Sequence, residues 1–154
     1  MIKLSKVNEV EFKEYLDFMI PDHANEITKN FNLTMEQALE ESEMMINEMF
    51  KDGLATEGQC LYNIIKANSN EKVGLLWYSV IPEINSAYLY HILIDEHHRG
   101  KGFGTKTIEM LQDKLRERGV SSIGLSVFGK NDGAYRLYKK MGYSNTRISM
   151  EKTL

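Results

Sequence analysis

The sequence predicts an α/β protein in which a mixed, mostly antiparallel central sheet is flanked by helices on both faces. Short extended runs rich in β-branched and aromatic residues alternate with longer segments of helical periodicity. Three of the extended runs follow one another with only turns between them, which predicts an antiparallel meander. Hydrophobic residues make up 42% of the 154 residues and charged residues 27%, so the chain can bury a core as one domain spanning residues 1–154.

The first part of the chain is predicted to form one strand and two helices. Residues 1–7 alternate as a strand does. Asn8 and Glu11 have the spacing of a helix cap, and Pro21 is expected to end the helix that follows, leaving residues 22–32 as a polar stretch with room for a short helix. Thr34 and Gln37 have the spacing of a capping box for a second helix, which Gly53 should end.

The remaining chain completes the order β-α-α-β-β-β-α-β-α-β. Its expected strands are residues 60–67, 73–81, 87–95, 121–128 and 146–153. Its expected helices are residues 107–118 and 133–141, which Gly119 and Gly142 end. In this arrangement the strand at residues 87–95 is central in the sheet.

Residues 99–105, with the sequence Arg-Gly-Lys-Gly-Phe-Gly-Thr, are the most informative stretch of the chain. They join a predicted strand to a predicted helix, and their three glycines leave backbone N–H groups uncovered at the helix end whose dipole favours an anion. His97, His98, Arg99 and Lys101 add positive charge. The stretch therefore predicts a site for a phosphate or pyrophosphate group.

Two common phosphate loops do not fit these residues. A dinucleotide fingerprint, G-x-G-x-x-G, needs a glycine where Thr105 stands. A nucleotide-hydrolase loop, G-x-x-x-x-G-K-[ST], begun at Gly100 finds Lys106 and Thr107 in place but again needs glycine at Thr105. The spacing that does fit is Arg-x-x-Gly-x-Gly, formed by Arg99, Gly102 and Gly104.

A second block follows the predicted strand at residues 121–128. It places an asparagine at the head of a short helix and continues as Ala-x-x-Leu-Tyr-x-x-x-Gly-Tyr, through Asn131, Ala134, Leu137, Tyr138, Gly142 and Tyr143. Together the two blocks resemble the GNAT superfamily of N-acetyltransferases, strongly over residues 75–143 and by element order over the whole chain.

The resemblance implies that the chain binds acetyl-CoA and transfers its acetyl group to an amine of a small molecule or peptide. In the family, the strand before the loop splays from its neighbour and pairs with the pantetheine arm, while the loop holds the pyrophosphate. The residues that match the cofactor contacts are Ile92, Leu93, Ile94, Arg99, Gly100, Lys101, Gly102, Phe103, Gly104, Thr105, Asn131, Ala134 and Tyr138. Family members are often dimers, which leaves a homodimer open.

The resemblance places the Tyr138 hydroxyl near the thioester sulfur, where a neutral phenol can donate a proton to the leaving thiolate as general acid. Helical spacing alone would instead make Tyr138 a core aromatic residue. Some family members have a basic glutamate where this chain has Tyr88. His91 is a candidate base on the same strand, although strict alternation turns it away from the face of Tyr88. Glu57, Glu83 and ordered water are the other candidates.

Composition narrows the remaining functions. One cysteine, Cys60, excludes an internal disulfide and fits a reducing cytoplasm. Residues 1–60 have a net charge of −8 and residues 61–154 of +5, so the glycine stretch lies in the basic part and the acidic part suits a cationic amine. Solvated glutamate-rich helix faces would give the same asymmetry.

No basic run suggests nucleic acid and no apolar run is long enough to span a membrane. His97 and His98 lack further ligands in a recognisable spacing, so no metal is expected.

Two alternatives to the transferase stay open. A CoA or acetyl-CoA sensor without transfer activity is supported by the absence of the strand glutamate at Tyr88. A nucleotide hydrolase is disfavoured by Thr105 and by the lack of a carboxylate placed to hold magnesium.

Overall fold

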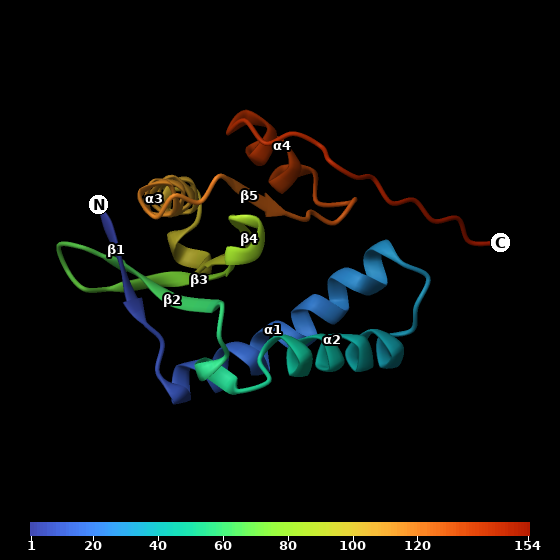
Figure 1. Cartoon of the computed structure of the whole chain (residues 1–154). Helices are drawn as coiled ribbons and strands as arrows, with labels where there is room; N and C mark the ends of the chain where they lie inside the picture. Colours follow the sequence, from blue (N-terminus) through green and yellow to red (C-terminus); the bar gives the residue numbers. More distant parts are fainter. The chain divides into compact units, whose positions relative to one another are not determined.

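The computed structural model describes residues 1–154 and contains five strands, four α-helices and three short 3₁₀ turns (Figure 1). The strands are β1 Ile2–Lys6, β2 Gln59–Lys66, β3 Lys72–Ile81, β4 Ser86–Ile94 and β5 Ser122–Leu125. The helices are α1 Glu9–Asn30, α2 Met35–Met49, α3 Phe103–Glu117 and α4 Asp132–Lys140. The turns are η1 Gly53–Ala55, η2 Pro82–Ile84 and η3 Glu96–His98. No helix combines the length and the apolar character that crossing a bilayer requires.

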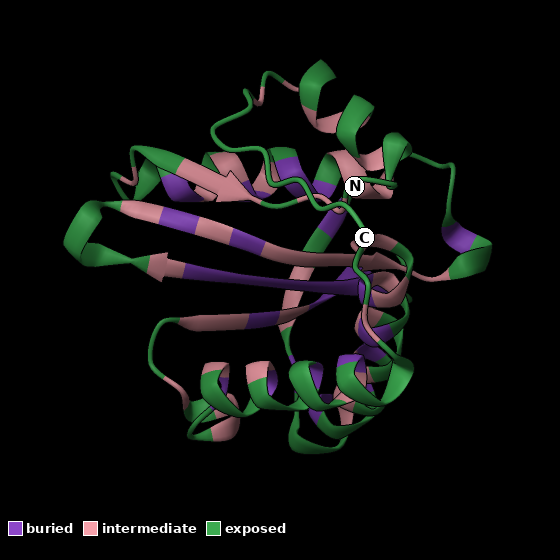
Figure 2. Ribbon diagram, turned by 90° about the vertical axis from the view of Figure 1, so that its right-hand side faces the viewer, coloured by how far each residue is buried: buried purple, intermediate pink, exposed green.

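The five strands form one sheet in the order β1-β2-β3-β4-β5. The first three pairings are antiparallel, as the predicted meander requires, and only β4 and β5 run parallel. This confirms the predicted α/β class with a mixed, mostly antiparallel sheet. The middle strand is β3 rather than β4, and β3 is buried along most of its length (Figure 2).

The chain divides into two compact units. The first comprises residues 1–13 and 49–126 and contains the sheet and α3. The second comprises residues 14–48 and 127–154 and contains most of α1 and α2 together with α4. The single domain expected from the sequence stays a prediction.

In the first unit, α3 packs against the sheet and contacts β4 and β1. Its buried stripe consists of Ile108, Leu111 and Leu115, the spacing that an amphipathic helix buries on one face. The Lys114 ammonium lies 4.9 Å from the centre of the Tyr62 ring, a cation–π contact that continues this interface to β2. The helix therefore holds its N-terminus at a fixed place after β4.

In the second unit, α1 and α2 pack through buried Ala24, Ile27 and Ala38. The prediction that Pro21 ends the first helix is wrong, because α1 continues to Asn30 with Pro21 inside it. A proline in a helix interior costs one hydrogen bond and about 3 kcal/mol. Burial of Ala24 and Ile27, beyond Pro21, supplies apolar contacts that offset this cost.

The predicted closing strand at residues 146–153 is also wrong, because residues 143–154 form no regular secondary structure. Their alternation of polar and apolar residues is typical of a strand, but a strand exists only where a neighbour accepts its backbone hydrogen bonds. No strand of the sheet pairs with this segment. Within its unit the segment makes side-chain contacts instead, in which Glu151 Oε2 accepts the Asn32 N–H at 2.9 Å and Asn145 Nδ2 donates to the Tyr135 hydroxyl at 3.0 Å.

Two buried tyrosines predict an alkaline limit to stability. Burial raises the pKa of Tyr15, with a contribution from the Asp22 charge, and burial raises the pKa of Tyr78 as well. Each tyrosine has a pKa of about 10 in the unfolded chain and a higher one in the folded protein. Its contribution to stability is therefore complete below about pH 10 and is lost as the pH rises further, because the unfolded chain then ionises more readily. We expect the free energy of unfolding to fall above about pH 10, by up to roughly 1.4 kcal/mol per pH unit for each tyrosine.

Urea unfolding followed by circular dichroism between about pH 8 and pH 11 measures this effect. The double variant Tyr15→Phe/Tyr78→Phe should lose less stability over the same range, since its buried rings cannot ionise. Equal losses in the wild type and the double variant would contradict the assignment.

Candidate functional site

The N-terminus of α3 presents uncovered backbone N–H groups, as the glycine stretch predicts. Gly102 is the N-cap of α3 with φ of 82°, and no side chain caps the helix. Gly100 also has a positive φ, 74°, a backbone conformation that favours glycine. The N–H groups of Phe103, Gly104 and Thr105 belong to the first helical turn and have no intrahelical acceptor. This end of α3 can bind an anion through its N–H groups and its dipole.

Arg99 ties the start of this loop back to β4. Its Nε donates a hydrogen bond to the Ile94 carbonyl oxygen at 2.9 Å, and its side chain is otherwise exposed. The contact uses one of the five N–H groups of the guanidinium and leaves the terminal amino groups for an anion. The arginine in the Arg-x-x-Gly-x-Gly spacing therefore closes the loop and adds positive charge beside the α3 N-terminus.

The end of β4 has an open edge on the side of β5. The parallel pairing runs from Ser86 opposite Ser122 to Leu89 opposite Leu125, and it ends there. The rest of β4, through Ile94, is paired only with β3. Strand β5 ends at Leu125, so β4 beyond Leu89 has no partner strand on this side, and the splaying that the family resemblance implies stays a prediction.

The pairing with β3 decides which backbone groups face this edge. The Asp95 N–H donates to the Val73 carbonyl at 2.8 Å, so Asp95, Leu93 and His91 are the residues that exchange hydrogen bonds with β3 up to the register shift. The N–H and C=O groups of Ile92 and Ile94 then face the open edge. The match of Ile92, Leu93 and Ile94 to pantetheine contacts stays a prediction, and the register favours Ile92 and Ile94 for backbone pairing.

A register shift in β4 overturns the expected orientation of His91. The pairs Trp77 with His91 and Tyr78 with Leu89 leave Tyr90 as an extra residue, a β-bulge. Since Ser79 opposes Tyr88 and Trp77 opposes His91, the histidine lies on the face of Tyr88 rather than on the opposite one. Strict alternation could not reveal this, because a bulge shifts every side chain beyond it.

Aromatic rings cover the face of the sheet on which His91 and Tyr88 lie. Trp77 stacks on Tyr90 with ring centres 4.5 Å apart, and Tyr90 contacts Tyr88 at 4.7 Å. Trp77 is buried and its Nε1 donates to Gln59 Oε1 at 2.8 Å, so it is a packed residue of the sheet. The Tyr88 hydroxyl forms a hydrogen bond with the Ser126 hydroxyl. Glu57 and Glu83, the other candidate bases on the chain, are exposed.

The second block of predicted site residues lies on α4, in the other unit. Asn131 is the N-cap of α4, and its Oδ1 accepts the Ala134 N–H at 3.2 Å, which leaves its amide donors unused by the cap. Tyr138 is half-buried and its ring contacts Tyr143 with centres 5.4 Å apart. Burial raises the pKa of Tyr138, and the neighbouring Tyr143 adds to this shift. The phenol is therefore protonated at neutral pH.

The predicted site residues thus form two groups. The end of β4 and the loop from Arg99 to Thr105 adjoin within the first unit, and Asn131, Ala134 and Tyr138 adjoin within the second. Cys60 is half-buried in β2, and burial raises the pKa of its thiol, so it is not an activated nucleophile.

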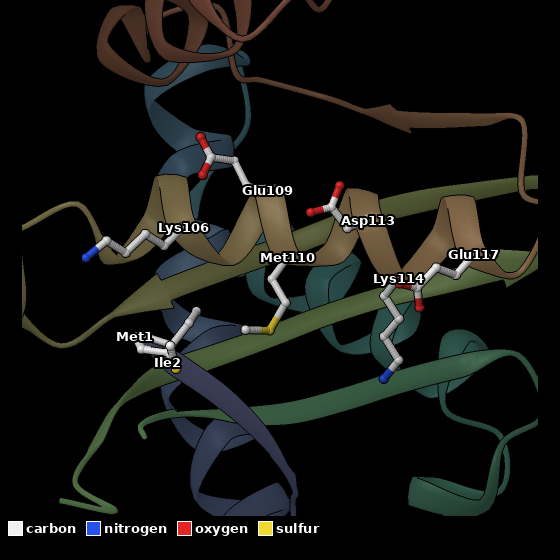
Figure 3. A pocket seen from close by; sticks show the side chains of 8 residues that line it. All are labelled: Met1, Ile2, Lys106, Glu109, Met110, Asp113, Lys114 and Glu117. Carbon is white, nitrogen blue, oxygen red and sulfur yellow. The ribbon is translucent and has the colours of Figure 1, made fainter. Parts of the chain in front are cut away.

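A surface pocket of about 460 Å³ lies along the side of α3, and Met1 and Ile2 also line it (Figure 3). Its side chains include three carboxylates and two amines, on Glu109, Asp113, Glu117, Lys106 and Lys114. Because this lining alternates in charge, it lacks the uniform positive character of the α3 N-terminus.

Sequence reasoning missed one neighbour of the loop. Glu71, in the turn before β3, lies beside the adjacent His97 and His98, and the ligand atoms of all three side chains are within 4.8 Å of one another. The signal was present in the predicted meander, because antiparallel pairing brings the start of one strand to the end of the next.

Comparisons with a family model, with curated sequences and with solved structures agree on one protein family. Residues 24–143 match the model of the acetyltransferase (GNAT) family. The uncharacterized N-acetyltransferase YdgE of Bacillus subtilis is 30% identical over 98% of this chain and 97% of its own length. The crystal structure of the putative acetyltransferase YycN of Bacillus subtilis, 28% identical, superposes with a TM-score of 0.93 over 100% of this chain and 99% of that one.

A more distant structure shares the fold. PaiA N-acetyltransferase from Thermoplasma acidophilum, solved in complex with coenzyme A, is 14% identical and has a TM-score of 0.64 over 94% of this chain and 90% of its own.

Proposed function

Because the chain belongs to the GNAT family of acetyltransferases, we propose that it moves the acetyl group of acetyl-CoA to a primary amine by direct attack. The observation that carries the proposal is the uncapped N-terminus of α3, with two glycines at positive φ, directly after the open edge of β4. This combination offers adjoining places for a pyrophosphate and for an extended amide-containing arm.

Acetyl-CoA supplies both of these groups. Its pyrophosphate would accept hydrogen bonds from the N–H groups of Phe103, Gly104 and Thr105, with Arg99 and Lys101 adding positive charge. Its pantetheine amides would pair with the backbone of Ile92 and Ile94. The coenzyme A complex of the PaiA enzyme, which shares this fold, supports the assignment of the donor.

The proposed reaction requires few groups of the protein. The neutral amine attacks the thioester carbonyl carbon, and the charge that develops on the carbonyl oxygen is stabilised by backbone N–H groups at the open edge of β4. The carbon–sulfur bond then breaks, and the Tyr138 hydroxyl donates its proton to the thiolate. The raised pKa of Tyr138 keeps that proton available at neutral pH. The amine releases a proton to a base or to water.

His91 is the candidate for this base. It lies on the same face of the sheet as Tyr88, the position where some family members have a glutamate, and imidazole titrates near neutral pH. Ordered water is the alternative acceptor of the proton. A covalent route through Cys60 receives no support, because burial raises the pKa of that thiol.

The acceptor is a primary amine of a small molecule or peptide. The net charge of −8 over residues 1–60 favours a cationic acceptor, since neighbouring carboxylates attract an ammonium group. A CoA-binding sensor without transfer activity is the second candidate function. It is favoured by Tyr88, which stands where some family members have a basic glutamate and whose hydroxyl is hydrogen-bonded to Ser126.

A thermal-shift screen tests the donor. Acetyl-CoA and CoA should raise the melting temperature, whereas ATP and NAD should leave it unchanged, because a ligand stabilises only the folded protein that binds it. Stabilisation by ATP alone would contradict an acyl-CoA site.

Replacing Gly102 with valine should weaken acetyl-CoA binding by about tenfold or more, the effect of losing one hydrogen bond to a charged group. Valine would force a strained backbone at φ of 82°, so the N–H groups that follow in the loop would lose their present orientation. Gly119→Val is the matched control, because Gly119 has φ of 79° and open space around it but lies past the other end of α3. Isothermal titration should show weakened binding only for Gly102→Val, and equal affinities of the two variants would remove the loop from the donor site.

A further inference from the structure

Two adjacent histidines and a glutamate form a cluster that the transfer reaction does not use. Glu71 lies in the turn before β3, and His97 and His98 lie in η3 directly before the glycine loop. The ligand atoms of the three side chains are all within 4.8 Å of one another. Side chains of neighbouring residues usually diverge, but η3 brings the two imidazole rings to 4.1 Å between centres.

His98 is the buried member of the cluster. It is 3% exposed, and neither of its ring nitrogens has a hydrogen-bond partner. Its Nε2 lies 3.2 Å from Glu71 Oε1, close enough for an ion pair but without the alignment of a hydrogen bond. Buried polar groups in proteins are nearly always bonded, and an imidazole nitrogen without a partner is satisfied by a proton donor, an acceptor or a metal ion.

The backbone beneath the cluster is held on both sides. The Asp95 N–H bonds to the Val73 carbonyl, which fixes the end of β4 against the start of β3. The His98 N–H bonds to the Asp95 carbonyl at 2.8 Å and closes η3. The two segments that carry the three side chains are therefore positioned by the sheet itself, which favours a preformed site.

We propose that Glu71, His97 and His98 bind a divalent transition-metal ion of the zinc type. Two imidazoles and one carboxylate are ligands that Zn²⁺ takes, leaving a fourth position for water. With bond lengths near 2.0–2.1 Å, the ligand atoms of a tetrahedral ion lie roughly 3.4 Å apart. His97 and Glu71 are both exposed, so rotation of their side chains can close the present spacing without moving the sheet.

One cation competes for the carboxylate. The Lys66 ammonium lies 2.8 Å from Glu71 Oε2 and leaves Oε1 beside His98. Lys66 also lies 5.8 Å from the centre of the Phe103 ring, the first residue of α3. The ion would therefore share Glu71 with Lys66, which contacts the start of α3. Binding of the ion would link the β2–β3 turn to the segment that leads into the glycine loop.

Titration of the full chain with Zn²⁺ by calorimetry, and with Co²⁺ by visible absorption, tests the proposal. We expect one equivalent to bind, with the absorption bands of a four-coordinate Co²⁺ site. His97→Asn and Glu71→Gln should each weaken Zn²⁺ binding by about tenfold or more. Glu96→Gln is the matched control, because Glu96 is an exposed carboxylate of the same turn and lies outside the cluster.

Absence of stoichiometric binding to the wild type would overturn the site, and so would binding that persists unchanged in either variant. Both variants replace exposed side chains, so they should fold, which circular dichroism verifies. The titrations contain neither acetyl-CoA nor an amine, and their outcome is independent of whether the chain is a transferase.

Discussion

Replacing Tyr138 with phenylalanine is expected to lower kcat by about 10²-fold or more, with little change in the Kd for acetyl-CoA. The change removes the hydroxyl that would protonate the CoA thiolate and keeps the ring, including its contact with Tyr143. Steady-state release of free thiol gives kcat, and titration of acetyl-CoA gives Kd. A loss confined to kcat is the signature of an interaction made in the transition state.

Tyr135→Phe is the matched control. Tyr135 lies on the same helix, its side chain is exposed, and its hydroxyl accepts a hydrogen bond from Asn145 Nδ2 at 3.0 Å. We expect this variant to keep the wild-type rate. An unchanged rate for Tyr138→Phe would remove the tyrosine from the role of acid.

Replacing Gly74 with alanine is expected to destabilise the fold by at least about 3 kcal/mol, the upper range for forcing added atoms into a packed core. A Cβ at this position would lie 2.1 Å from the Leu93 carbonyl oxygen and 3.1 Å from the Ile94 Cα. Both neighbours are backbone of β4, so they cannot move aside without opening the β3–β4 pairing. The melting temperature should fall by roughly 6–12 °C.

Gly133→Ala separates this effect from a general cost of substituting glycine. Gly133 lies in α4, and a Cβ there meets nothing within 4 Å. Alanine in a helix is favoured over glycine, so this variant should be neutral or more stable by about 0.5–1 kcal/mol. If calorimetry gives both variants the same melting temperature, the close approach of β3 and β4 is not required for stability.

The elements that the sequence predicted correctly are those that local chemistry specifies. Asn8 Oδ1 accepts the Glu11 N–H at 2.8 Å, and Glu11 Oε1 accepts the Asn8 N–H at 3.1 Å, so the predicted cap of α1 is confirmed. Thr34 and Gln37 form the predicted capping box of α2. The glycine stretch indicated the turn before α3, because positive φ at Gly100 and Gly102 favours glycine, but the helix begins at Phe103 rather than at residue 107 as expected.

The features that were missed depend on contacts distant in the sequence. Helix α1 continues past Pro21 because residues beyond it are buried, and the strand expected at residues 146–153 lacks a pairing partner. The face of His91 follows from the bulge at Tyr90, which two strands create together. Glu71 joins the histidines only through the β3–β4 register. Residue patterns indicate local preferences, whereas these outcomes are set by packing.

The same distinction applies to the candidate site. The anion-binding end of α3 was readable because three glycines and an arginine lie together in the sequence. The open edge of β4 beyond Leu89 follows from the end of β5 at Leu125, whereas the splaying of the two strands was expected only from the family resemblance and stays a prediction. The acceptor has no such signal, since no motif of the chain specifies which amine is bound.

Amine-dependent release of CoA thiol from acetyl-CoA is the measurement that bears most directly on the proposed activity. The assay presents acetyl-CoA with a panel of polyamines, aminoglycosides, amino acids and peptide N-termini, and a thiol reagent records CoA as it forms. We predict release that depends on one class of amine, with the acetylated product confirmed by mass spectrometry. Tight binding of acetyl-CoA without thiol release for any amine would contradict the transferase and favour the sensor.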